Sequence, residues 1–124
     1  MARILIIEDE DDIRGLCKRI LEHSGHEVTE ASDGNSGMSL YREHLHDIII
    51  TDIIMPEKEG IEMIMELRRD FPEVKIIAIS GGGHAMTGPA CLQLAKRLGA
   101  VTTLAKPFSR QELLDAVDEA LASD

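Results

Sequence analysis

The feature that most constrains the fold is a regular alternation of two hydrophobic patterns along the chain. Short runs rich in β-branched residues occur at residues 3–7, 27–30, 47–51, 75–79 and 101–104. Between these runs, apolar residues recur at spacings of three and four, which is typical of one face of a helix. These helical segments centre on residues 13–21, 35–45, 61–65, 91–98 and 113–121. The sequence therefore predicts five strands that alternate with five helices.

This order restricts the architecture to one class. The runs at 3–7, 47–51 and 75–79 are almost continuously apolar, as expected of strands that are covered on both faces. Right-handed crossovers between successive strands then give a parallel sheet with helices on both sides. A chain of 124 residues fits a single domain with one core. We therefore expect an α/β fold with a doubly wound, five-stranded parallel sheet.

Several residues predict where the helices begin and end. Ser109 and Glu112 form a capping box at the start of the last helix. Gly25, after the first helix, and Gly99, before the last strand, are positioned where the chain needs a positive φ. Asp33 and Gly34 indicate a turn into the second helix.

Polar side chains follow four of the predicted strands. Glu8, Asp9 and Glu10 follow the first strand, and Asp52 follows the most apolar run of the chain. Because burial of a charge is costly, we expect Asp52 at the open end of its strand rather than inside the core. Ser80 and Lys106 follow the fourth and fifth strands. Ligands of parallel α/β sheets bind beyond the carboxyl ends of the strands, so these groups are expected to converge there.

The expected cluster suits phosphoryl chemistry. Neighbouring carboxylates repel one another, and a hard divalent cation such as Mg²⁺ relieves that repulsion while it also binds phosphoryl oxygens. Asp52 is positioned to act as a nucleophile on phosphorus, and Mg²⁺ and Lys106 would stabilise the transition-state charge. Ser80 would donate a hydrogen bond to a phosphoryl oxygen.

Composition argues against several other classes. The net charge of −10 and the lack of a Lys and Arg cluster disfavour a nucleic-acid partner. No apolar run reaches membrane-spanning length, and the N-terminus lacks the features of a signal peptide, so we expect a cytoplasmic protein. Cys17 and Cys91 are interpreted as reduced core residues. His44 and His46 suggest a metal pair, but their position at a helix end favours a solvated turn.

Four blocks of the sequence, in order and spacing, resemble bacterial response-regulator receiver domains. They are ILIIEDEDDIRGLCKRIL, DIIITDIIMPEKEGIEMI, IIAISG and LAKPFSRQELLDAV, and the resemblance covers essentially the whole chain. It implies a flavodoxin-like sheet with strand order 2-1-3-4-5. It also implies that residues 1–124 are a receiver domain of the chemotaxis-regulator type, apparently stand-alone, with no output domain in this chain.

The resemblance also implies roles for individual residues. Asp52 matches the phosphoacceptor, and Glu8 and Asp9 match the acidic pair that organises Mg²⁺. Ile54 matches the position whose backbone carbonyl binds the metal, so the implied metal set is Glu8, Asp9, Asp52 and Ile54. Ser80 matches the switch hydroxyl.

Lys106 matches the lysine that binds the phosphoryl group, and its peptide bond to Pro107 is expected to be cis. Thr103 stands at the switch position where many receivers have an aromatic ring. Since threonine cannot signal by a ring flip, this position departs from the family pattern.

The family resemblance implies a phosphorylation-controlled switch rather than an enzyme with a separate substrate. The donor would be a sensor histidine kinase or a histidine phosphotransfer protein, and the output would be a protein partner bound by a monomer. Two alternatives stay open. One is a pseudo-receiver that binds partners without phosphorylation, and the other is a small hydrolase that works through an aspartyl phosphate.

Overall fold

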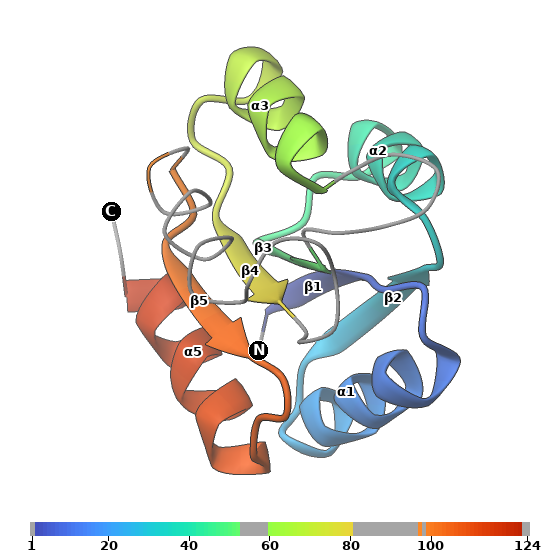
Figure 1. Ribbon diagram of the computed structural model, residues 1–124, viewed down its shortest axis with the longest axis vertical. Coiled ribbons are helices and arrows are strands. Elements are labelled where there is room, and N and C mark those ends of the chain that lie inside the picture. Colours follow the sequence, from blue (N-terminus) through green and yellow to red (C-terminus); the bar gives the residue numbers. More distant parts are fainter. Residues whose placement is uncertain (1, 53–59, 81–96, 98, 123–124) are drawn as a thin grey trace.

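The computed structural model describes residues 2–52, 60–80, 97 and 99–122. Within these residues, five strands form one parallel sheet in the order β2-β1-β3-β4-β5 (Figure 1). The strands are β1 (Arg3–Ile7), β2 (Glu27–Ala31), β3 (Ile48–Asp52), β4 (Ile76–Ser80) and β5 (Thr102–Ala105). The predicted doubly wound, flavodoxin-like sheet is confirmed, and β3, β4 and β5 each begin one residue later than expected.

The helices follow the predicted alternation. They are α1 (Asp11–His23), α2 (Gly34–Glu43), α3 (Gly60–Asp70) and α5 (Arg110–Ala122). The helix expected over residues 91–98 falls almost entirely outside the described residues, so it stays a prediction. None of the helices that the structure describes is long and apolar enough to cross a bilayer.

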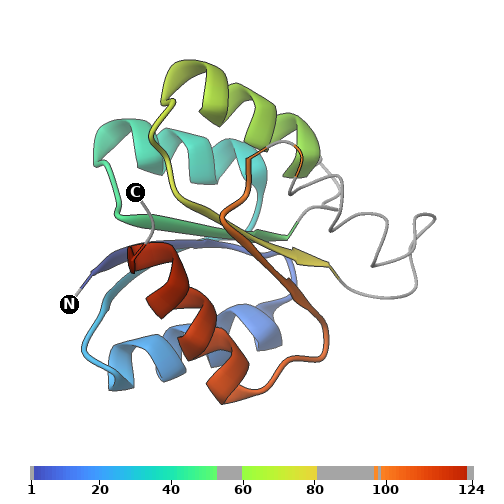
Figure 2. The ribbon, with the colours of Figure 1, turned by 90° about the vertical axis from the view of Figure 1, so that its left-hand side faces the viewer.

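The sheet lies between two layers of helices (Figure 2). Helices α2 and α3 cover one face, and α1 and α5 cover the other. Alternate residues of each strand point to opposite layers. Leu5 and Ile49 face α2 and α3, whereas Ile6 and Ile50 face α1 and α5. Because both faces are buried, the central strands need no polar positions, which explains their continuous apolar runs.

The predicted helix boundaries are formed by the expected residues. The backbone N–H of Ser109 donates to Glu112 Oε1 at 2.9 Å, and the N–H of Glu112 donates to Ser109 Oγ at 3.1 Å. Asp33 caps α2 by accepting a hydrogen bond from the N–H of Ser36 at 2.8 Å. Gly25 and Gly99 have φ values of 94° and 108°, a region that favours glycine.

Four apolar residues that the helical spacing included are exposed, one of them Leu121 of α5 at 38%. Leu16 is 46% exposed because it lies at the edge of the narrow buried stripe of α1, formed by Cys17, Ile20 and Leu21. Leu45 is 61% exposed because α2 ends at Glu43, two residues before it. Met65 is 56% exposed on α3, whose Met63 and Ile64 are fully buried instead.

The contact between α2 and β1 predicts opposite effects of alanine at two helical glycines. A Cβ added to Gly37 would overlap the buried side chain of Ile7, with Cγ1 at 2.6 Å and Cδ1 closer still. A Cβ on Gly15, in α1, meets nothing within 4 Å. Gly37→Ala should therefore lower the free energy of unfolding by about 1–3 kcal/mol, whereas Gly15→Ala should raise it by about 0.5–1 kcal/mol through helix propensity.

Urea denaturation of both variants measures the two effects. A Gly37→Ala protein as stable as Gly15→Ala would contradict the close packing of α2 on Ile7.

Candidate functional site

The carboxyl ends of four strands bring the predicted residues to one edge of the sheet. Ile7, at the end of β1, pairs with Thr51 of β3, and Asp52 pairs with Ile79 of β4. Ser80 pairs with Ala105, the last residue of β5. The residues just beyond Ile7 and Ala105 therefore meet Asp52 at this edge.

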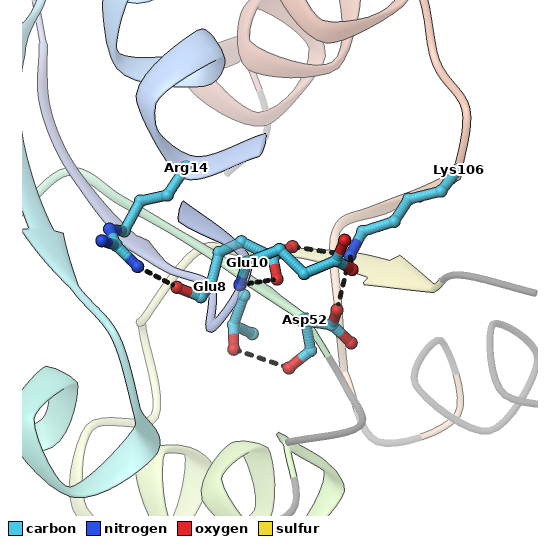
Figure 3. A network of polar contacts seen from close by, with 6 residues as sticks. Glu8, Glu10, Arg14, Asp52 and Lys106 are labelled. Atoms are coloured by element: carbon cyan, nitrogen blue, oxygen red, sulfur yellow. Dashed lines mark hydrogen bonds and ion pairs between the residues drawn. The ribbon is translucent and has the colours of Figure 1, made fainter. Parts of the chain in front are cut away.

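The ammonium of Lys106 joins the acids of this edge (Figure 3). Its Nζ lies 2.8 Å from Asp52 Oδ2, 2.8 Å from Glu8 Oε1 and 2.9 Å from Glu10 Oε1. The contacts to Asp52 and Glu10 are hydrogen bonds as well as ion pairs. A lysine from the loop after β5 thus binds carboxylates from β3 and from the loop after β1.

Glu8 is held in place from several sides. Its side chain is 1% exposed, and its backbone N–H donates to the carbonyl of Ala31 at the end of β2. Its Oε2 accepts the N–H of Glu10 at 3.0 Å, and its own carbonyl accepts from Arg14 Nη1 at 2.8 Å. Oε1 of Glu8 is buried and lacks hydrogen-bond geometry to any described group, so its contact with Lys106 is purely an ion pair.

Asp52 ends β3 as expected, but it is more enclosed than the sequence suggested. It is 2% exposed, and its carboxylate forms an ion pair with Lys106. The Thr51 hydroxyl donates to the carbonyl of Asp52 at 2.9 Å. Asp52 therefore lies at the end of its strand, as expected, yet it is buried there, and the ion pair with Lys106 offsets part of the cost of burying its charge.

Burial and contacts between charged groups shift two pKa values at the site. Burial raises the pKa of the Glu8 carboxyl from 4.5 to about 7, although Lys106 and the N–H of Glu10 partly oppose this rise. Burial also disfavours the charged form of Lys106, but its bonds to Asp52, Glu8 and Glu10 outweigh burial and raise its pKa above the usual value. Lys106 therefore stays charged across the physiological range.

The acids form a candidate cation site. Glu8, Asp9, Glu10 and Asp52 each offer a carboxylate oxygen, and these oxygens all lie within 4.8 Å of one another. Asp9 and Glu10 are exposed, whereas Glu8 and Asp52 are buried. Three of these four carboxylates pair with the ammonium of Lys106, so negative charge exceeds positive charge among the described residues of the site. An all-oxygen donor set with excess negative charge fits a hard divalent cation such as Mg²⁺.

The remaining predicted positions are placed only in part. The backbone of Ser80 ends β4 at this edge, but its side chain lies outside the described residues, as does all of Ile54. Thr103 is half-buried within β5 and pairs with Ala78. The peptide bond between Lys106 and Pro107 is cis, the isomer that the family resemblance implies.

The two histidines lie elsewhere and form no metal cluster within the described part of the chain. His46 is half-buried, with Nε2 3.3 Å from Thr29 Oγ1 and its ring stacked on Tyr41. With His44, it lines a hollow of about 270 Å³ near the amino ends of β1 and β2, whose other lining residues are Arg3, Glu27, Val28, Thr29 and Leu40. This hollow is remote from the acids at the carboxyl ends of the strands.

Two residues take part in the site although no role was predicted for them from the sequence. Glu10 was seen as part of an acidic run but was given no role, although it binds Lys106. Arg14 bridges the Glu8 carbonyl, Asp11 and Glu30. Its spacing of six residues from Glu8, on the first turn of α1, is the one sequence signal for this bridge.

Comparisons with known proteins agree on one family. The model of the response regulator receiver domain matches residues 4–118. The response regulator receiver protein CpdR of Brucella abortus is 33% identical over 121 residues, which cover 98% of this chain and 98% of CpdR. The DNA-binding transcriptional regulator NtrC of Azospirillum brasilense is 32% identical over 123 residues, or 99% of this chain. The chain spans only 25% of the length of NtrC.

A solved structure gives the same result in three dimensions. The crystal structure of a response regulator receiver domain protein from Clostridium thermocellum is similar to this chain with a TM-score of 0.89 and 32% identity. The alignment covers 98% of this chain and 94% of that one.

The excess of carboxylates predicts that the site lowers stability when no cation is present. Asp9→Asn should raise the free energy of unfolding by about 0.5–1 kcal/mol in the presence of a chelator, because it removes one charge from the repelling group. The same variant should lose most of the stabilisation that Mg²⁺ gives the wild type. Thermal unfolding with chelator and with Mg²⁺ measures both effects.

Asp118→Asn is the matched control, since it removes an exposed acid from α5, outside the acid group. Equal behaviour of the two variants would contradict the assignment of Asp9 to a cation site.

Proposed function

The chain belongs to the response regulator receiver domain family, and from this premise we propose that it is a phosphorylation-controlled signalling switch with Asp52 as its phosphoacceptor. The observation that carries this proposal is the contact between Lys106 Nζ and Asp52 Oδ2 at 2.8 Å, inside a group of four carboxylates. A buried carboxylate with a fixed cation beside it, at the ligand-binding edge of a parallel sheet, suits the capture of a phosphoryl group.

The proposed reaction is a single displacement at phosphorus. An ionised oxygen of Asp52 attacks the phosphorus of the donor, and an O–P bond forms while the bond to the leaving group breaks. The leaving group departs with the electron pair of that bond. No general base is required, because the attacking group carries no proton when it reacts.

Two kinds of positive charge would assist this reaction. Lys106 contacts Asp52 directly and would neutralise charge on the transferred phosphoryl oxygens. Glu8, Asp9 and Asp52, with the backbone carbonyl of Ile54, are the proposed ligands of Mg²⁺. When bound, Mg²⁺ supplies Lewis-acid stabilisation of the phosphoryl oxygens. Arg14 fixes the carbonyl of Glu8 and thereby holds the loop that carries two of these acids.

Phosphorylation would then change the contacts that surround Asp52. A phosphoryl group on Asp52 adds negative charge and several acceptor oxygens. In our proposal, Ser80 and Lys106 bind these oxygens, and their differential contacts shift an equilibrium between two conformations. Thr103 of β5, which pairs with Ala78 of β4, occupies the switch position. Its small side chain would transmit the change by packing rather than by a ring flip.

The proposed partners are proteins. A sensor histidine kinase or a histidine phosphotransfer protein would donate the phosphoryl group, and a downstream protein would recognise the phosphorylated form. The nearly complete overlap with CpdR, a receiver protein of similar length, supports residues 1–124 as one receiver unit. The net charge of −10 agrees with output through a protein rather than through direct contact with nucleic acid.

The phosphoacceptor is tested by chemical phosphorylation. Incubation with Mg²⁺ and acetyl phosphate should add one phosphoryl group to the wild type, and intact-mass spectrometry detects it. Asp52→Asn should reduce this uptake at least about 100-fold, because a neutral amide is a far weaker nucleophile than a carboxylate. Asp118→Asn, the control for loss of one acidic charge, should behave as the wild type does.

Three other outcomes would change this assignment. A folded wild type that takes up no phosphoryl group but still binds a partner would support the pseudo-receiver alternative. Steady release of phosphate from a phosphate ester would support the hydrolase alternative. Uptake that persists in Asp52→Asn would place the acceptor on another residue.

A further inference from the structure

The ammonium of Lys106 is already paired with three carboxylates in the observed arrangement. Its Nζ donates hydrogen bonds to Asp52 at 2.8 Å and Glu10 at 2.9 Å, and Glu8 Oε1 lies 2.8 Å away as an ion pair. A phosphoryl group on Asp52 would take over the contact that Asp52 makes, and its further oxygens would compete with Glu8 and Glu10 for the same ammonium. The identity of the partner that leaves therefore controls access to Lys106.

Burial identifies that partner as Glu10. The side chain of Glu8 is 1% exposed and is fixed by its bond to the N–H of Glu10, so a released Glu8 carboxylate would stay buried without a cation. Such a charge is costly. The side chain of Glu10 is 56% exposed, and water can solvate its carboxylate as soon as it leaves Lys106. Figure 3 shows Glu10 and Asp52 reaching the same ammonium.

We propose that Glu10 regulates this site by competing with the phosphoryl group for Lys106. In the unphosphorylated protein, Glu10 occupies Lys106 and adds negative charge at the entrance to Asp52. It therefore slows phosphorylation by anionic donors, and it moves toward solvent as the phosphoryl group replaces it at Lys106. This inference rests on the proposed function of Asp52, and it assigns Glu10 a positioning role that acts through Lys106.

A role as a metal ligand makes the opposite prediction for the same residue. The carboxylate of Glu10 is one of the four that lie within 4.8 Å of one another. If it held Mg²⁺, its removal would weaken Mg²⁺ binding and slow phosphorylation. If it competes for Lys106, its removal speeds phosphorylation and leaves Mg²⁺ binding largely unchanged. The variant Glu10→Gln separates the two roles.

This substitution does not disturb the start of α1. Glu10 stands at the N-cap of the helix, but its side chain makes no capping hydrogen bond. Its backbone N–H, which binds Glu8 Oε2, is retained in the variant. Asp12→Asn is the matched control, since it removes one exposed acidic charge from the first turn of the same helix.

The first measurement is the initial rate of phosphorylation by acetyl phosphate at saturating Mg²⁺. Glu10→Gln should raise this rate about threefold at low ionic strength, the size expected when a half-exposed ion pair is released. Asp12→Asn should change it much less. The gain in Glu10→Gln should shrink as salt is added, because salt screens exposed charges; a purely structural effect would not follow ionic strength in this way.

The second measurement is the Mg²⁺ concentration at half of the maximal thermal stabilisation, without any phosphoryl donor. It should agree within about twofold between the wild type and Glu10→Gln. A rise of roughly tenfold or more, the loss expected when a metal site is disturbed, or a slower phosphorylation would overturn the proposal. Equal rates in wild type and variant would overturn this inference alone. Lack of phosphorylation in both proteins would overturn the function proposed for Asp52.

Discussion

The site depends on one ammonium that is shared among carboxylates at the edge of the sheet. Lys106 is the cation that meets Asp52, Glu8 and Glu10 together within the described residues. Without it, the two buried acids would lose the cation that the described residues place beside them both, and the desolvation of a buried charge costs several kcal/mol. With it, both acids can stay buried. The electrostatics of the site therefore depend on a side chain from the loop after the edge strand β5.

The core fixes that position through the register of parallel strands. Ile50 and Ile77 face the layer of α1 and α5, while Leu5 and Ile76 face the layer of α2 and α3. A shift by one residue in any of these strands would send its apolar side chains to the wrong layer. Because both layers are apolar, such a shift would cost much free energy, and the strand ends keep their relative positions. The isoleucine-rich strands thus position the polar groups at and just beyond their carboxyl ends.

The sequence predicted the fold well because its signals are local and repeated. Alternating patterns, the Ser109 capping box and the turn glycines each act within a few residues, and their agreement leaves few topologies. Parallel connectivity predicted that the polar strand ends share one edge, and the family resemblance supplied the strand order that makes them neighbours. The exposed positions of Leu16 and Met65 were not predicted, because periodicity gives the direction of an apolar stripe but not its width. The binding of Glu10 to Lys106 joins residues 96 positions apart, and no local pattern encodes such a contact.

The balance of charge at the site links its chemistry to its movement. Phosphorylation would add charge to a group in which carboxylates already outnumber cations, so the added charge must be met by a rearrangement of Lys106 and of any bound cation. Lys106 lies directly after β5 and is followed within four residues by the start of α5 at Arg110. In the function that we propose, a change in the acid that Lys106 contacts would be felt by the segment that joins β5 to α5. The same electrostatic imbalance that suits a cation and a phosphoryl group would then also favour a change at the surface beside α5.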